Sequence, residues 1–172
     1  GARELATLDR FYRDTCFRKG SEPYLADGFF EALVETPARR RLVAALAYDG
    51  DTLVGGTIDF EKGKHLYGRY WGCADRYDAL HFELCYYQLI ERAITKGMTR
   101  FEAGAQGEHK IKRGLLPSDV HHYHRFEHPG LREAVTEYLA RERHGVREEM
   151  LILGRESPFH REHHDVAAKE GE

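Results

Sequence analysis

The sequence lacks the long apolar runs, the leader and the cysteine patterns that mark several classes of protein. No apolar run approaches the roughly 18 residues of a membrane span, and the N-terminus lacks the charged-then-apolar order of a secretory signal. The three cysteines are an odd number without CxxC spacing, which suggests neither a disulfide framework nor a zinc knuckle. No serine lies in a GxSxG motif, which argues against a hydrolase-type nucleophile. We therefore expect reduced thiols and a cytoplasmic protein.

The chain also lacks a strong charge of one sign. Its 26 Lys and Arg and 29 Asp and Glu give a net charge of -3 with the 11 His neutral, so no overall field attracts nucleic acid or an anionic membrane. The 172 residues are 41% hydrophobic and 32% charged, which suits a globular protein rather than a disordered one. We expect a single domain over residues 1–157 and a polar, loosely ordered tail over residues 158–172.

Two amphipathic helices are expected first. Apolar residues recur at helical spacing over residues 3–19, and Gly20 stands where that helix should end. A shorter helix is expected to begin at Asp27 as its N-cap and to end before Pro37. Three extended runs follow, and the glycine-containing turns between them predict an antiparallel meander over residues 42–48, 52–60 and 64–71.

Period-two alternation divides the side chains of the third run between the two faces of the sheet. One face should carry His65, Tyr67, Arg69 and Trp71, and the other Leu66, Gly68 and Tyr70. Asp78 could cap a largely apolar helix over residues 79–96, and further elements are expected at residues 98–103 (strand), 120–126 (strand) and from Pro129 (helix). This order predicts an α/β fold with a mixed sheet flanked by helices, and a cleft where neighbouring strands splay.

The segment 101–114 is the densest candidate for a functional site. Its glycines let the backbone approach a ligand closely. Between and after them stand an amide, a carboxylate, an imidazole and cations, supplied by Gln106, Glu108, His109, Lys110 and Arg113. A strand that runs into such a turn is a common site layout, although a solvated loop is the alternative.

A second candidate joins Arg69 and Tyr70 to the start of the long helix, where free N–H groups could hold a phosphate or an oxyanion. On this apolar helix, His81 and Glu83 should be paired or lie at a cleft, because an unpaired buried charge is costly. The alternative is that Tyr70 and Trp71 lie in the core and Arg69 on the surface. No metal is expected, since the histidines at residues 121–128 have no carboxylate or cysteine at a ligand spacing.

Several of these segments resemble predicted N-acyltransferases of the FemAB-like, peptidoglycan-biosynthesis-related family. The resemblance covers roughly residues 5–155 and rests on residues 11–12, 24–25, 29–30, 67–73, 80–88, 104–110 and 113–114. It implies a fold similar to that of GCN5-related acyltransferases. Family members are usually about twice as long, so the resemblance also implies that this chain is a C-terminal half whose N-terminal half is missing.

The resemblance further implies transfer of an acyl or aminoacyl group to a small-molecule amine acceptor. Such a reaction needs a base and an oxyanion stabiliser. Glu83, Glu108, His81 and His109 are the competing bases, and Lys110 is the expected partner of the oxyanion or of a donor phosphate. The residues expected to bind substrate or donor are Arg69, Tyr70, His81, Gln106, Gly107 and Arg113.

The acyl donor is left open. Acyl-CoA is one candidate, although residues 71–76 lack the usual pyrophosphate-binding signature. An aminoacyl-tRNA, the donor of FemAB-like relatives, is the other, although the net charge does not indicate it. A homodimer is also open, as is a non-catalytic role in which this half binds a ligand or forms an interface.

Overall fold

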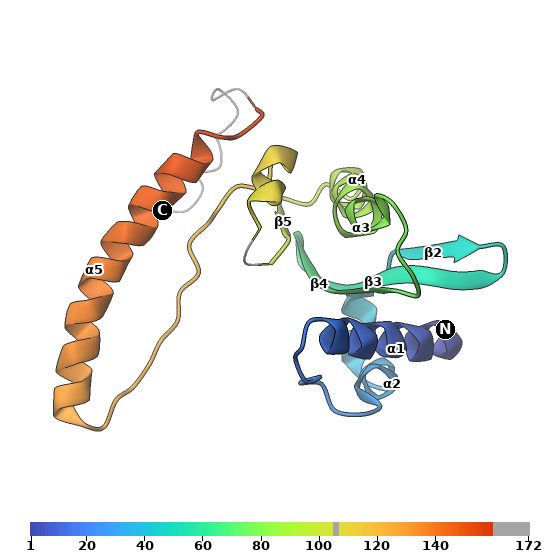
Figure 1. Cartoon of the computed structure of the whole chain (residues 1–172), viewed down its shortest axis with the longest axis horizontal. Coiled ribbons are helices and arrows are strands. Elements are labelled where there is room, and N and C mark those ends of the chain that lie inside the picture. Colours follow the sequence, from blue (N-terminus) through green and yellow to red (C-terminus); the bar gives the residue numbers. More distant parts are fainter. Residues whose placement is uncertain (105–106, 160–172) are drawn as a thin grey trace. The chain divides into compact units, whose positions relative to one another are not determined.

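The computed structural model describes residues 1–104 and 107–159. Contacts within the chain divide it into two units, Gly1–Ala105 and Gln106–Glu172, each of which is described by itself (Figure 1). The single domain over residues 1–157 stays a prediction, and most of the predicted tail lies outside the described residues.

The first unit holds the sheet. Its helical segments are α1 (Ala2–Arg18), α2 (Phe29–Val34), the 3-10 helix η1 (Pro37–Arg41), α3 (Leu80–Phe82), the π-helical turn η2 (Glu83–Tyr87) and α4 (Gln88–Thr95). Its strands are β1 (Leu42–Val43), β2 (Leu46–Asp49), β3 (Thr52–Lys62), β4 (His65–Cys73) and β5 (Arg100–Glu102). The second unit contains the 3-10 helix η3 (Glu108–Arg113) and α5 (Pro129–Gly154).

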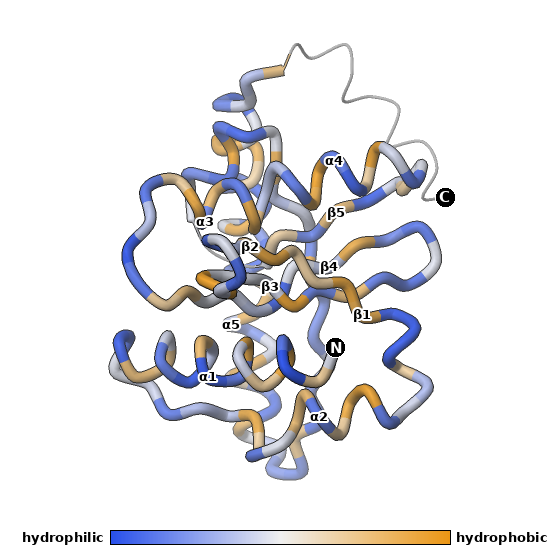
Figure 2. Tube along the Cα trace, turned by 90° about the vertical axis from the view of Figure 1, so that its right-hand side faces the viewer, coloured by the Kyte–Doolittle hydropathy of each residue, from blue (hydrophilic) through white to orange (hydrophobic). Residues whose placement is uncertain are grey.

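The predicted mixed sheet flanked by helices is confirmed. β1 and β2 pair along the same edge of β3, β3 and β4 are antiparallel, and β4 pairs in parallel with β5. Figure 2 shows α1 and α2 on one side of this sheet and α3 and α4 on the other. The two sides bury separate apolar clusters, the first around Phe11, Phe30 and Ile58 and the second around Leu66 and Leu89.

The predicted helix caps are wrong at both positions. α2 begins after Gly28, whose φ of 72° favours a glycine, while Asp27 instead forms an ion pair with Arg13 at 2.8 Å. The helix predicted over residues 79–96, called the long helix below, consists of α3, η2 and α4 in succession. It begins after Ala79, which has a φ of 60° and takes the N-cap position expected for Asp78. Both caps depend on how the preceding loop approaches the helix, which periodicity does not encode.

The structure also differs from the predicted elements after β5. Residues 120–126 form no strand and pair with none of the described strands. Three of these seven residues are histidines and one is an arginine, which offer little apolar surface to bury against a neighbour. The helix predicted from Pro129 is confirmed as α5. Among the described residues, no helix combines the length and apolar character needed to cross a membrane.

A bulge in β4 changes which side chains share a face. The register pairs Ile58 with Tyr70 but Asp59 with Gly68, so Arg69 is an extra residue on β4. Residues before the bulge alternate as predicted, whereas those after it are inverted. Tyr70 consequently packs against the α1–α2 cluster rather than on the side of Leu66, so the predicted face for Tyr70 is wrong.

The run 42–48 is also interrupted, although residues 42–43 and 46–47 share one register with β3, which shifts only between Ala47 and Tyr48. At the break, the N–H of Ala45 donates to the Thr57 hydroxyl at 3.2 Å instead of to a main-chain carbonyl. The Thr57 N–H still donates to the Ala45 carbonyl at 2.9 Å. A side chain thus replaces one rung of the ladder, and the predicted strand appears as β1 and β2.

Close packing of α1 on β4 makes Gly72 a test of the fold. A Cβ on Gly72 would lie 2.5 Å from the Phe11 Cβ and 2.6 Å from the Phe11 carbonyl oxygen, and neither backbone can move aside. We expect Gly72→Ala to lower the free energy of unfolding by about 2 kcal/mol or more, as overpacking does. Urea denaturation of the variant measures this change.

Gly68→Ala is the matched control in the same strand. Its Cβ would meet nothing closer than the Glu102 carbonyl oxygen at 3.4 Å, an ordinary contact. This substitution should change the free energy of unfolding by less than about 0.5 kcal/mol. Equal effects of the two substitutions would contradict the packing of α1 on β4.

Candidate functional site

The bulge in β4 separates residues that the sequence placed in one candidate site. The Tyr70 ring lies 5.4 Å from that of Tyr12 on the α1–α2 side of the sheet. Trp71, the next residue, turns to the other side and its ring lies 5.3 Å from His81. Tyr70 and His81 therefore occupy opposite faces of the sheet. Arg69 remains beside Tyr70, with its guanidinium carbon 5.6 Å from the Tyr70 ring centre.

His81 lies in an aromatic environment at the start of the long helix. Besides Trp71, the rings of Phe82 and Tyr86 lie 5.4 Å and 5.5 Å from it. Glu83 is exposed and accepts a hydrogen bond from the Gln88 side chain at 2.7 Å. Glu83 is thus paired, as one of the two predicted alternatives required, but its partner is the Gln88 amide and its carboxylate is exposed rather than buried.

The residues of the glycine-rich candidate gather on η3 in the second unit. Gly107 has a φ of 106°, and a Cβ there would lie 2.6 Å from the His109 ring, so the imidazole folds back over Gly107. The Arg113 guanidinium donates to the His109 carbonyl at 2.8 Å. His109 is exposed, whereas Lys110 is half-buried. The predicted residue Gln106 lies outside the described residues, and no side-chain position is described for Glu108.

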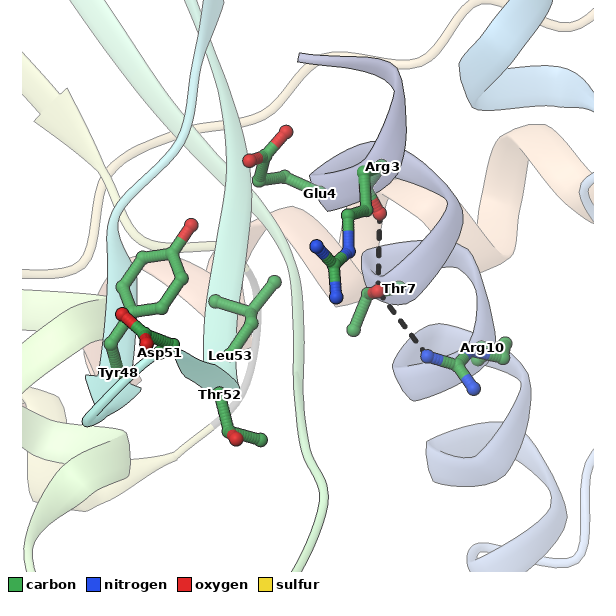
Figure 3. Close-up of a pocket in the computed structure, with 8 residues that line it drawn as sticks. All are labelled: Arg3, Glu4, Thr7, Arg10, Tyr48, Asp51, Thr52 and Leu53. Atoms are coloured by element: carbon green, nitrogen blue, oxygen red, sulfur yellow. Dashed lines mark hydrogen bonds between the residues drawn. The ribbon is translucent and has the colours of Figure 1, made fainter.

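A groove separate from the predicted site residues lies between α1 and the β2–β3 hairpin (Figure 3). It has a volume of about 220 Å³. Arg3 and Arg10 extend from the helix, and Tyr48 and Asp51 from the hairpin. All four side chains are exposed and the walls carry both signs of charge. This groove offers no buried acid or base for acyl transfer.

The side chains of the described residues form no cluster that would contradict the expectation of no metal. Within residues 1–104 and 107–159, no three His, Cys, Asp or Glu side chains lie close enough together to hold a metal ion. In the histidine-rich segment, His122 stacks on His124 with ring centres 6.4 Å apart. The absence of a metal therefore stays a prediction.

Comparison with known proteins identifies the family. A family model for FemAB-like proteins, described as peptidoglycan biosynthesis/recognition, matches residues 1–161. The chain belongs to the FemAB-like family. This confirms the resemblance seen in the sequence at the family level, whereas the GCN5-related arrangement and the C-terminal-half assignment stay predictions.

Other matches to this FemAB-like chain are few. Among solved structures it is similar to an aminoglycoside acetyltransferase, HMB0005, from an uncultured soil metagenomic sample. The two share 19% identity and a TM-score of 0.41, over 72% of this chain and 88% of that one. That likeness is too slight to transfer a fold or a function. No curated protein matches the sequence.

The FemAB-like sheet contains a buried acid that sequence reasoning missed. Asp59 is 1% exposed and lies on the α4 side of β3. The Thr57 hydroxyl donates to its Oδ2 at 2.6 Å, and the N–H of Arg69 donates to its Oδ1 at 3.3 Å. A carboxylate in the middle of an otherwise buried strand was the signal that could have revealed it.

The environment of Asp59 shifts its ionisation. Burial disfavours the charged form and raises the pKa of Asp59 from 3.8 to about 7. The hydrogen bonds from Thr57 and Arg69 and the charge of Arg92 act in the opposite direction, but they offset only part of this effect. Asp59 thus changes charge near neutral pH while bonded to the bulged residue of β4.

The raised pKa predicts a pH-dependent stability that Asp59→Asn should remove. The folded protein holds the proton of Asp59 up to about pH 7, whereas the unfolded chain loses it near pH 4, so unfolding becomes easier as the pH rises between these values. The free energy of unfolding should fall by about 1.4 kcal/mol per pH unit in this window relative to the Asn variant. Urea denaturation of both proteins from pH 4.5 to 8 measures the difference. Parallel profiles would contradict the raised pKa.

Proposed function

We propose that this FemAB-like chain takes part in transferring an acyl or aminoacyl group to an amine acceptor. The observation that carries the proposal is the family match over residues 1–161, which includes both the long helix and the glycine-rich segment. The order of elements supports it, because a helix connects two parallel strands at whose ends ligands commonly bind.

The parting of β4 and β5 supports a donor site next to these strands. Their pairing ends at Tyr67 and Glu102, whereas β4 continues to Cys73. Beyond Tyr67, no described strand pairs with this edge of β4. Free main-chain groups on such an edge can bind an extended polar ligand, as in strand addition. The amide groups of an acyl donor suit this edge.

The chemistry requires two groups from the protein. The amine nitrogen of the acceptor attacks the acyl carbonyl carbon, so a C–N bond forms and the bond to the donor's sulfur or oxygen breaks. A base takes the proton from the attacking nitrogen, and the departing thiol or alcohol receives a proton. A cation stabilises the oxyanion of the intermediate, a contribution of about 3 kcal/mol for one well-placed donor.

We assign these roles to η3 rather than to Glu83. Lys110 is half-buried, and the short helix also carries Glu108 and His109. Glu83 is exposed and bonded to Gln88, so nothing in its surroundings would exclude water from a reacting amine. We propose Lys110 as the oxyanion partner and Glu108 or His109 as the base. Gly107 and Arg113 would support the same segment.

The donor and the partners remain predictions. Acyl-CoA and an aminoacyl ester both present a carbonyl that this chemistry can attack. The missing N-terminal half, the homodimer and the cytoplasmic location also stay predictions.

One observation favours the non-catalytic alternative. None of the described side chains of α5 is buried, and its exposed apolar residues include Leu131, Tyr138 and Val146. A helix of 26 residues with an uncovered apolar stripe suits an interface. In that case the chain would bind a partner or a ligand and would transfer nothing.

Lys110→Ala tests the catalytic assignment. Loss of the oxyanion partner should lower the rate of transfer by about a hundredfold or more. The assay uses the full-length protein with acetyl-CoA or alanyl-tRNA as donor and a lysine-containing peptide as acceptor, and mass spectrometry detects the product.

Lys112→Ala is the matched control, because Lys112 lies on the same short helix and is exposed. Its rate should stay within about threefold of the unmodified protein. Equal rates for both variants would remove Lys110 from the mechanism. Absence of transfer by the unmodified protein with either donor would favour the non-catalytic alternative.

A further inference from the structure

Tyr24 is an exposed aromatic residue that is nevertheless held in a fixed position. It lies in the connection between α1 and α2 and is 70% exposed. Its main-chain N–H donates to the Tyr12 hydroxyl at 3.0 Å, and the N–H of Leu25 donates to the same oxygen at 3.3 Å. The Tyr24 ring lies 5.9 Å from that of Tyr12 and 6.3 Å from that of Tyr70. These contacts fix the connection without covering the ring.

The Tyr24 side chain also adjoins Tyr70. Partial desolvation, together with the neighbouring Tyr70 side chain, raises the pKa of Tyr24 to about 12. The hydroxyl therefore stays neutral at physiological pH. An aromatic ring whose main chain is fixed and which packs beside two other rings loses little conformational entropy when a ligand packs against it.

Arg69 places a cation beside this aromatic pair. The bulge turns the Arg69 side chain out of the sheet, where it is exposed, and its guanidinium carbon lies 5.6 Å from the Tyr70 ring centre. In the described part of the chain, its guanidinium forms no ion pair with a carboxylate. Its main-chain N–H donates to Asp59, which fixes where the side chain leaves the strand. The planar guanidinium is available to an external anion.

We propose that Tyr24, Arg69 and Tyr70 form a binding surface for a saccharide ring that carries a carboxylate. The C–H face of a pyranose ring packs on an exposed aromatic ring, whose face is electron-rich. A guanidinium takes a carboxylate through two parallel hydrogen bonds and so selects acidic sugars over neutral ones. Two kinds of sugar carry a carboxylate on a pyranose ring: sugars with a lactyl ether substituent and uronic acids.

This surface does not rest on the proposed acyl transfer. A saccharide can bind here whether or not the chain is catalytic, and the binding measurement needs no acyl donor. If transfer also occurs, the surface would recognise the acceptor.

NMR titration of the full chain with three probes tests the proposal. N-acetylmuramic acid and glucuronic acid supply the two carboxylate sources, and N-acetylglucosamine is the neutral control. Either acid should shift the amide resonances of residues 24, 69 and 70 and bind at least about tenfold more tightly than the neutral sugar. Added salt should weaken the binding of the two acidic sugars but not that of the neutral sugar. Shifts located elsewhere, or no binding by either acid below about 10 mM, would overturn the proposal.

Substitutions separate the two contributions. Tyr24→Ala should weaken binding of the preferred acid and of the neutral sugar by about tenfold, whereas Arg69→Gln should weaken only the acid by that factor. Tyr24→Ala keeps the main-chain bond to Tyr12, so the fold should persist. Tyr48→Ala and Arg76→Gln, at other exposed sites, are the controls and should leave affinity unchanged. Unchanged affinity in Tyr24→Ala and Arg69→Gln would show that the surface does not bind the sugar.

Discussion

Two side chains on β3 accept hydrogen bonds from main-chain N–H groups that have no partner in the strand pairing of the sheet. The N–H of Ala45 donates to the Thr57 hydroxyl, which donates to Asp59, and the other oxygen of Asp59 accepts the N–H of Arg69. A buried N–H without a partner would cost about 1 to 3 kcal/mol, so this chain of hydrogen bonds lets both irregularities persist. Strands on both sides of β3 thus depend on Thr57 and Asp59.

The bulge that Asp59 holds decides what each face of the sheet can do. With one extra residue at Arg69, the residue after it faces α1 and α2, and the next faces the start of the long helix. Without the bulge, Tyr70 would leave the aromatic cluster of Tyr12 and Phe30, and Trp71 would leave His81. One hydrogen-bonded acid therefore separates an aromatic surface with a cation from the aromatic neighbours of His81 on the opposite face.

The sequence predicted those features that depend on local periodicity. α1, the meander and the long helix follow from apolar spacing and glycine turns, and their order predicts the mixed sheet. It failed where tertiary hydrogen bonds decide. Asp27 and Asp78 have the chemistry of N-caps, but Gly28 and Ala79 occupy those positions, and alternation through β4 ignores an extra residue held by a distant side chain. For the candidate site, it placed Tyr70 and His81 together although the bulge places them on opposite faces.

The protonation of Asp59 affects its hydrogen bond with Thr57 but not its hydrogen bond with Arg69. Its pKa of about 7 means that both forms are populated near neutral pH. The Oδ1 atom can accept the Arg69 N–H in either form, provided that the proton resides on Oδ2. The Oδ2 atom, however, accepts from the Thr57 hydroxyl only when it carries no proton, and a protonated Oδ2 would instead donate to Thr57. Changes in pH should therefore be felt at Thr57 and at the break between β1 and β2, while the bulge keeps its hydrogen bond. The direction of the Arg69 side chain should therefore not depend on whether Asp59 is protonated, although the Arg69 N–H bonds to the other oxygen of the same carboxyl group.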